Sequence, residues 1–435
     1  MKVSFLIAAL LWAHIPSAAA QGAKLLQALS DLSPCAITCF TGALSTSTCT
    51  LADTNCICTS AQLQTAVEQC LLSTCSVKEG LTAQNVTATL CDQKPRDTSG
   101  ELKATNIALM VVSAAFVLSR LAQKLFNPTE AHLGTDDYLI FVTLLVGQPS
   151  TILIDRGLIP NGLGRDVWTL SFEQVTAFGK YFYWIEICYF AQLSVLKLAF
   201  LFFYKRIFPG RTIQKIILVT ILVNILYGIV FVAVAVFQCR PISYYWTTWD
   251  GEHTGHCINI NALVWANAAI SIAVDFWMLG IPLSQLIHLK LSWSKKAGVI
   301  MMFCLGTFAT VVSIIRLQFL ITFARTKNPT WDQQNITKWS AIEIAVGVVC
   351  SCIPSIRVIL VRVLPRTFGS SHDRDHRNRY HSTQGQSSKL SGFSRKHSDT
   401  GGSDKNPFTI HIASPSEYEV KRSLHTSDSQ KDLAL

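Results

Sequence analysis

The sequence predicts an all-α membrane protein with a small, disulfide-stapled helical extracellular domain, a seven-helix transmembrane bundle and a disordered tail. The 435-residue chain is 50% hydrophobic and only 15% charged, whereas average soluble domains carry about 25% charged residues. Eight of its 14 cysteines lie between Cys35 and Cys91, and seven long apolar segments follow them. Together these observations favour membrane spans over a large soluble core.

The first residues have the layout of a secretory signal peptide. Lys2 precedes an apolar run from Val3 to Ala13, and a run of small residues ends at Ala20. The apolar run is too short to cross about 30 Å of hydrocarbon at about 1.5 Å per residue. We therefore predict a signal peptide at 1–20 and export of the following region into an oxidising compartment.

The next region, 21–92, contains the cysteine cluster. An even number of cysteines in a short exported segment indicates a disulfide framework, because so small a domain buries too little surface to be securely stable. Each bridge adds about 2–4 kcal/mol by restricting the unfolded chain. A zinc site is the alternative, but the paired Cys-x2-Cys units typical of zinc are missing. The pairing stays open among Cys35, Cys39, Cys49, Cys56, Cys58, Cys70, Cys75 and Cys91.

Helical periodicity connects these cysteines. Leu63, Val67 and Leu71 share one face of a helix expected within 61–72. The Pro34-Cys35 entry, the cysteine spacing and an Asp-x2-Cys-x-Cys core resemble the CFEM domain of fungal extracellular proteins.

In haem-binding members of the CFEM family, an aspartate just before the Cys-x-Cys unit is an axial iron ligand. The resemblance therefore implies haem as a cofactor and Asp53 as its metal ligand. The alternative is that Asp53 caps a helix or a turn, which is a common role for aspartate. Asn85-Val86-Thr87 is a glycosylation acceptor if this domain is exported.

After a polar linker at 93–103, apolar segments recur through 104–366. Each reaches or approaches the roughly 20 residues that a helix needs to cross a bilayer. The predicted spans are 104–123, 137–155, 176–203, 214–237, 262–288, 297–323 and 340–363.

Seven crossings with an exported head place the tail inside the cell. The predicted inner loops carry more lysine and arginine than the outer ones, as the positive-inside rule requires. A second glycosylation acceptor, Asn335-Ile336-Thr337, falls outside in this topology. We therefore predict a multi-pass plasma-membrane protein with an extracellular N-terminus and a cytoplasmic C-terminus.

The loop between the fourth and fifth spans contains Cys239 and Cys257, which would close it as a disulfide. The alternative is a bond from either one to Cys188, which the predicted third span places too deep.

Three short motifs carry a second resemblance. Tyr204-Lys205-Arg206 ends the third span, Cys239-Arg240-Pro241 opens the outer loop, and Cys350-Ser351-Cys352 lies in the last span. They resemble the fungal rhodopsin-like seven-helix domain. Fused to a CFEM domain, it is the architecture of a fungal receptor-like class linked to surface sensing and pathogenic development. Retinal is not expected, because 340–363 contains no lysine for a Schiff base.

Several ionisable residues fall within the spans, where charges usually face the bundle interior. Arg316 is the natural partner for Glu186, whereas Glu343 is near a span end in this prediction. The interpretations that stay open are structural contacts between helices and a ligand or ion site. The intramembrane polar candidates are Glu186, Lys197, Asp275 and Arg316.

The tail, 367–435, is rich in serine, threonine, glycine and charge, so we expect it to be disordered. The main hypothesis is a cell-surface, G-protein-coupled-receptor-like protein that senses an extracellular or surface cue through its head. Its partners would be membrane lipid, a G protein α subunit and kinases at the inner loops and tail. Haem or iron capture and adhesion are the alternatives. Catalytic motifs and a basic nucleic-acid-binding domain are not found, so neither an enzyme nor a nucleic-acid partner is expected.

Overall fold

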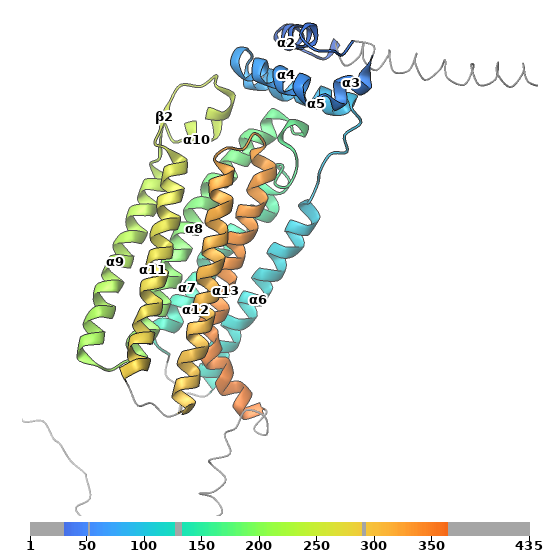
Figure 1. Ribbon diagram of the computed structural model, residues 1–435. Coiled ribbons are helices and arrows are strands. Elements are labelled where there is room, and N and C mark those ends of the chain that lie inside the picture. The colour runs from blue at the N-terminus through green and yellow to red at the C-terminus, as the bar shows by residue number, and fades with distance from the viewer. Residues whose placement is uncertain (1–29, 51–52, 127–132, 289–292, 364–435) are drawn as a thin grey trace, which may run out of the picture. The chain divides into compact units, whose positions relative to one another are not determined.

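The structure is a computed structural model that describes residues 30–50, 53–126, 133–288 and 293–363 (Figure 1). The predicted signal peptide at 1–20 and tail at 367–435 lie outside the described residues. Seven of the described helices are long and apolar enough to cross a membrane, which confirms the predicted all-α membrane fold. These are α6 (Ser99–Phe126), α7 (Thr135–Ile152), α8 (Phe172–Ile207), α9 (Arg211–Val236), α11 (Ile260–His288), α12 (Trp293–Phe323) and α13 (Pro329–Val363).

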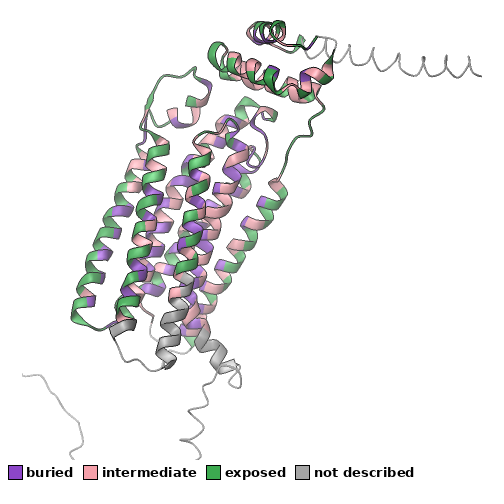
Figure 2. Cartoon of the chain, viewed as in Figure 1, coloured by how far each residue is buried: buried purple, intermediate pink, exposed green. Residues whose placement is uncertain are grey.

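Helix α9 buries one side and exposes the other, as Figure 2 shows. On α9, Ile213, Ile217 and Ile221 recur at helical spacing and are buried, whereas Leu222 and Leu226 are exposed. Large apolar side chains exposed along a helix of bilayer length are suited to contact lipid.

Helices α8 and α9 approach closely where Gly228 faces Ser194. A Cβ atom at Gly228 would lie 2.2 Å from the Ser194 hydroxyl oxygen. The Asn224 side chain donates to the Ser194 carbonyl at 3.0 Å, and the Ser194 hydroxyl donates to the Asn224 carbonyl at 3.3 Å. Small residues and interhelical hydrogen bonds of this kind hold membrane helices together, because the hydrophobic effect does not favour one helix neighbour over lipid.

The second span ends in a π-helical turn, η1 (Leu153–Leu158), that follows Pro149. The loop beyond it contains a short 3-10 helix, η2 (Val167–Thr169). Gly164 in this loop has φ of +78°, and a Cβ there would meet Thr98 and Leu102 within 2.8 Å. Glycine therefore allows the loop to lie directly against the start of α6.

The last helix begins earlier than the predicted span at 340–363. Pro329 occupies the first turn of α13, where its missing N–H costs nothing. Polar residues at 332–335 lower the local hydropathy, so a hydropathy-based prediction misses this part of the helix, although Gln333 and Ile336 are buried. Asn335 consequently lies half-buried within α13 and not in an outer loop.

The loop between α9 and α11 is held by two short antiparallel strands, β1 (Cys239–Arg240) and β2 (His256–Cys257). Between them lie α10 (Tyr244–Thr247) and η3 (Thr248–Asp250). Cys239 and Cys257 are paired in register and form a disulfide, while Cys188 is free. The predicted closure of this loop is therefore confirmed.

The head consists of α2 (Pro34–Ser45), α3 (Thr54–Thr59), α4 (Ala61–Thr74) and α5 (Val77–Leu90). Side chains that accept backbone hydrogen bonds cap the helices, and Ser76 with Glu79 forms a reciprocal capping box at α5. Only a few side chains form its core, among them Ala43, Ile57 and Leu63.

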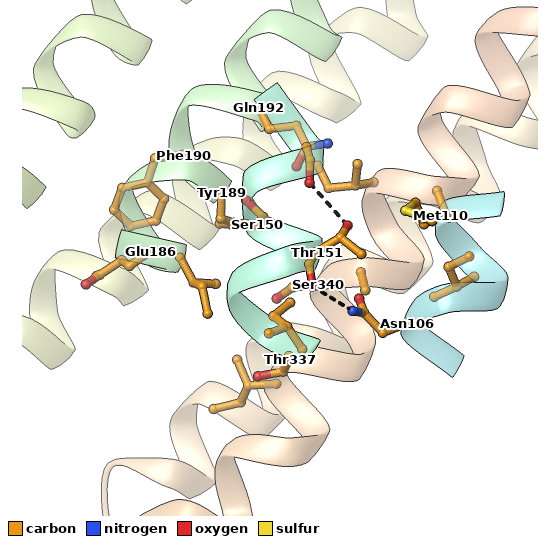
Figure 3. A pocket seen from close by; sticks show the side chains of 18 of the residues that line it. Asn106, Met110, Ser150, Thr151, Glu186, Tyr189, Phe190, Gln192, Thr337 and Ser340 are labelled. Atoms are coloured by element: carbon orange, nitrogen blue, oxygen red, sulfur yellow. Dashed lines mark hydrogen bonds between the residues drawn. The ribbon is translucent and has the colours of Figure 1, made fainter. Parts of the chain in front are cut away.

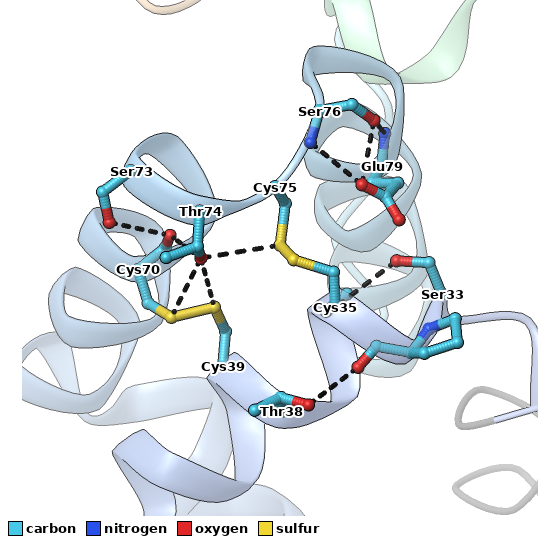
Figure 4. The surroundings of a disulfide bond; sticks show 12 residues. Ser33, Cys35, Thr38, Cys39, Cys70, Ser73, Thr74, Cys75, Ser76 and Glu79 are labelled. Carbon is cyan, nitrogen blue, oxygen red and sulfur yellow. Dashed lines mark hydrogen bonds between the residues drawn. A yellow bond between two sulfur atoms is a disulfide. The ribbon is translucent and has the colours of Figure 1, made fainter.

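Four disulfides staple this small head and settle the pairing that the sequence left open. Figure 4 shows two of them on either side of the Thr74 hydroxyl, which lies 3.3 Å from the Cys39 sulfur. The bridges are Cys35–Cys75, Cys39–Cys70, Cys49–Cys56 and Cys58–Cys91.

We predict that removing Cys58–Cys91 destabilises the head more than removing Cys49–Cys56, because the two bridges close loops of 33 and 7 residues. Loop entropy gives about 4 kcal/mol for the first and about 2.5 kcal/mol for the second. Hydrogen exchange of head amides in full-length protein, with each cysteine pair replaced by serine, measures the difference. Equal losses of protection would contradict it.

Candidate functional site

The head is joined to the bundle at Asp166, whose side chain is only 3% exposed. In the segment that leads into α6, Arg96 donates from Nε to Asp166 Oδ1 at 2.9 Å and from its backbone N–H to Asp166 Oδ2 at 3.3 Å. Asn328, between α12 and α13, donates to the same carboxylate at 2.8 Å. The Arg96 guanidinium also stacks 4.1 Å from the ring of Trp331. One carboxylate therefore connects the segment below the head to two loops of the bundle.

Two further contacts connect the head itself to these loops. Lys78 on α5 reaches Glu252 at 2.6 Å and Asp250 at 3.7 Å in the loop after α9. Lys327 reaches Glu68 on α4 at 2.7 Å. Exposed ion pairs of this kind contribute little to stability, so they orient the head more than they stabilise it.

The pKa values of Lys78 and Asp250 are shifted in the directions that favour the charged form of each side chain. The hydrogen bond to Glu252 raises the pKa of Lys78 above 10.5. Burial opposes ionisation of Asp250, but hydrogen bonds from the Glu252 backbone and His253 and the charge of Lys78 lower its pKa below 3.8.

A cavity of about 490 Å³ lies between the head and the loops. Its head side is mainly apolar and includes Leu63, Val67 and Leu81, and its loop side includes Trp168 and Lys327. A molecule in this cavity would touch both parts of the protein at once.

Asp53 takes the capping role. Its Oδ1 accepts the Cys56 backbone N–H at 2.9 Å at the start of α3. The side chain is exposed and does not line the head cavity. Haem binding at Asp53 stays a prediction.

The two predicted glycosylation sites differ in surroundings. Asn85 is exposed on α5, whereas Asn335 is half-buried in α13. Glycosylation at both positions stays a prediction.

The predicted partner of Glu186 is wrong. Arg316 on α12 pairs with Glu343 on α13 at 3.2 Å, and both side chains are at most 4% exposed. Glu343 also accepts hydrogen bonds from Tyr189 and Ser313, so it is a core residue and not a span-end residue. The spacing of residues in the sequence does not show how α13 is rotated about its own axis. This rotation decides which acidic side chain meets Arg316.

The remaining intramembrane candidates each have at least one polar partner among the described residues. Lys197 on α8 pairs with Asp275 on α11. Glu186 accepts from the Gln238 amide and the Tyr245 hydroxyl, each at 3.1 Å. These contacts connect α8 to α11 and to the loop after α9.

Sequence reasoning missed a charged cluster at the opposite end of the bundle. Arg120 on α6 donates from Nε to Asp137 on α7 at 2.7 Å and also contacts Asp136 and the Ser351 carbonyl of α13. Lys124 pairs with Asp137. The comparison of inner-loop and outer-loop charges places Arg120 and Lys124 in an inner loop, whereas the structure buries both within α6. Two sequence features could have indicated this cluster. Arg120 and Lys124 are four residues apart and therefore share one helix face, and two acidic residues are adjacent at the start of α7.

Comparisons with known proteins agree with this architecture. Residues 119–362, more than half of the chain, match the fungal rhodopsin domain, and residues 28–92 match the CFEM domain. No solved structure matches.

Similar proteins are found in several fungi. The SAT4 family membrane protein of Emericella nidulans is 30% identical over 200 residues, 45% of this chain and 50% of that protein. The polyenoic acids biosynthesis gene cluster protein Ba17b of Metarhizium anisopliae is 25% identical over 273 residues, 60% and 72% of the two chains. Receptor GIN3 of Arthrobotrys oligospora is 22% identical over 197 residues, 45% and 47%. This chain spans about half the length of the first of these relatives.

We predict that Arg316→Met alone lowers stability by about 3–5 kcal/mol, because it leaves Glu343 charged and buried without its partner. The double variant Arg316→Met/Glu343→Gln should recover most of this loss. Thermal melting in nanodiscs measures both. A double variant less stable than Arg316→Met would contradict the pairing.

We predict that Lys78→Met lowers the melting temperature of the full-length protein between about pH 5 and 9. The Asp250 contribution is present above its ordinary pKa and is lost as the pH falls through its lowered value. The Lys78 contribution is present below its ordinary pKa and is lost as the pH rises through its raised value. The difference between wild type and variant should therefore shrink below about pH 4. The exposed Lys94→Met is the control, and an equal effect of both variants would refute the contact.

Proposed function

The chain belongs to the fungal rhodopsin family and carries a CFEM domain, and from this premise we propose that it is a cell-surface, G-protein-coupled-receptor-like protein. It senses an extracellular or surface cue through the cysteine-rich head. The observation that carries this proposal is the attachment of the head segment to the bundle loops through the buried Asp166.

This attachment offers a route for a signal. The Asp166 loop joins α7 to α8, and the Asn328 loop joins α12 to α13. A cue that moves the head therefore acts on the ends of four membrane helices. A ligand shifts such an equilibrium only if it binds the two conformations with different affinity, and a cavity lined by both head and loops provides contacts that change with head position.

Several features support the proposed orientation. Four disulfides in the head are suited to an oxidising compartment, which supports the proposed extracellular head and plasma-membrane location. The opposite end of the bundle carries Lys205, Arg206 and Arg211 around the short α8–α9 connection, a basic surface for a G protein α subunit and kinases. A relative that is 22% identical over 197 residues is named a receptor, Receptor GIN3.

We predict that Arg96→Met uncouples the head from the bundle, because it removes the charged donors that bind Asp166. A fungal strain that lacks the gene is complemented with wild type or variant, and gene-dependent transcription is compared across extracellular and surface conditions. The variant should reach the cell surface in normal amounts and lose the response.

The control variant is Arg156→Met. Arg156 lies at the same end of the bundle, is 83% exposed and pairs with Asp155 at 3.4 Å. It should respond like wild type. A deletion strain whose responses match those of the complemented strain in every condition would refute the receptor function.

A further inference from the structure

A second cavity, of about 140 Å³, lies inside the bundle and is lined by residues of α6, α7, α8, α11, α12 and α13. It occupies the half of the bundle nearer to the Asp166 loop. Figure 3 shows Asn106 of α6 beside Thr151 of α7, with Thr337 and Ser340 of α13 close by. The apolar part of the lining includes Met110 and Ile344. Polar side chains thus gather around a space within a membrane-spanning bundle.

Polar atoms among the lining residues lack partners within the described part of the chain. The Ser150 hydroxyl, the Arg316 Nη2 and the Glu186 Oε1 are buried, and none has a hydrogen-bond partner there. The three residues are 9%, 2% and 6% exposed. A buried polar group without a partner costs about 1–3 kcal/mol, so a ligand that brings hydrogen-bonding groups into this space gains affinity.

The charges around the cavity favour a neutral ligand. Arg316 is already neutralised by Glu343, and Glu186 already accepts two hydrogen bonds. No further unpaired positive or negative charge is found among the described lining residues. A charged ligand would lose its hydration without gaining an opposite charge.

The size of the cavity limits the ligand as well. An engineered protein cavity of about 150 Å³ binds benzene. This cavity is similar in volume but carries polar groups, so a ligand of about six to ten non-hydrogen atoms with one polar end is suited to it.

We propose that this cavity is a binding site for a small neutral amphiphile, namely a short-chain or aromatic alcohol. The ligand's hydroxyl group binds the Ser150 hydroxyl, which lacks a partner among the described residues, and the apolar body packs against Met110 and Ile344. The site goes beyond the proposed function, because it lies in the bundle and does not involve the head.

Equilibrium binding of tritiated benzyl alcohol to full-length protein in nanodiscs tests this site, with binding to empty nanodiscs subtracted. Saturable binding of one molecule per chain is expected. Toluene, benzoate and benzylamine serve as competitors at neutral pH. Each should compete at least about tenfold more weakly than benzyl alcohol, the loss expected for one missing hydrogen bond or one unpaired charge.

Neighbouring residues on α6 provide matched variants. Ser113 lines the cavity and is buried, whereas Val112 is 44% exposed on the outer side. Ser113→Phe should abolish binding, and Val112→Phe should leave it unchanged. Because Ser113→Phe adds volume to the core, Ser150→Ala is included as a conservative variant. It should weaken benzyl alcohol binding about three- to tenfold and leave toluene competition unchanged.

Each result decides the proposal. Absence of saturable binding to wild type overturns the site, and so does equal loss in Ser113→Phe and Val112→Phe. Toluene binding as tight as that of benzyl alcohol overturns the alcohol as ligand class. Binding is measured without any signalling readout, so Arg96→Met should bind normally. A failed receptor function and a failed binding site are thereby distinguished.

Discussion

Each buried charged side chain of the described bundle is paired or hydrogen-bonded, and the arrangement of the helices depends on this constraint. Within a bilayer a lone charge or polar group has no water to bind, so partners on neighbouring helices must supply the contacts. Lys197 with Asp275 connects α8 to α11, and Arg316 with Glu343 connects α12 to α13. At the end opposite the head, Arg120 connects α6 to α7 and α13. Apolar packing fills the space between these contacts.

The head obeys a different constraint, because it is too small to be stable through its core alone. Four disulfides supply what a core of a few side chains does not. Because the disulfides stabilise the head, it can present an apolar face toward the bundle loops. A larger domain would have buried such a face in its own core. Charged contacts at Asp166, Lys78 and Lys327 then hold this face over the loops.

The contacts of the head and the bundle cavity share structural elements. Helices α7, α8 and α13 border the cavity, and the loops at their ends carry Asp166 and Asn328. The helix ends that the head contacts therefore belong to the same helices that line the polar space inside the bundle.

The sequence by itself determined the features that depend on local composition. Hydropathy specified seven spans, and cysteine content specified a disulfide-stapled head. The position of Cys239 and Cys257 in one short loop specified the bridge between them. Features that depend on how helices rotate and meet were decided only by the tertiary structure. These are the pairing of the eight head cysteines, the partner of Arg316, the early start of α13, and the clusters around Asp166 and Arg120. The physical reason is that hydropathy is a property of a segment, whereas a contact requires the rotation and depth of two helices, which only packing fixes.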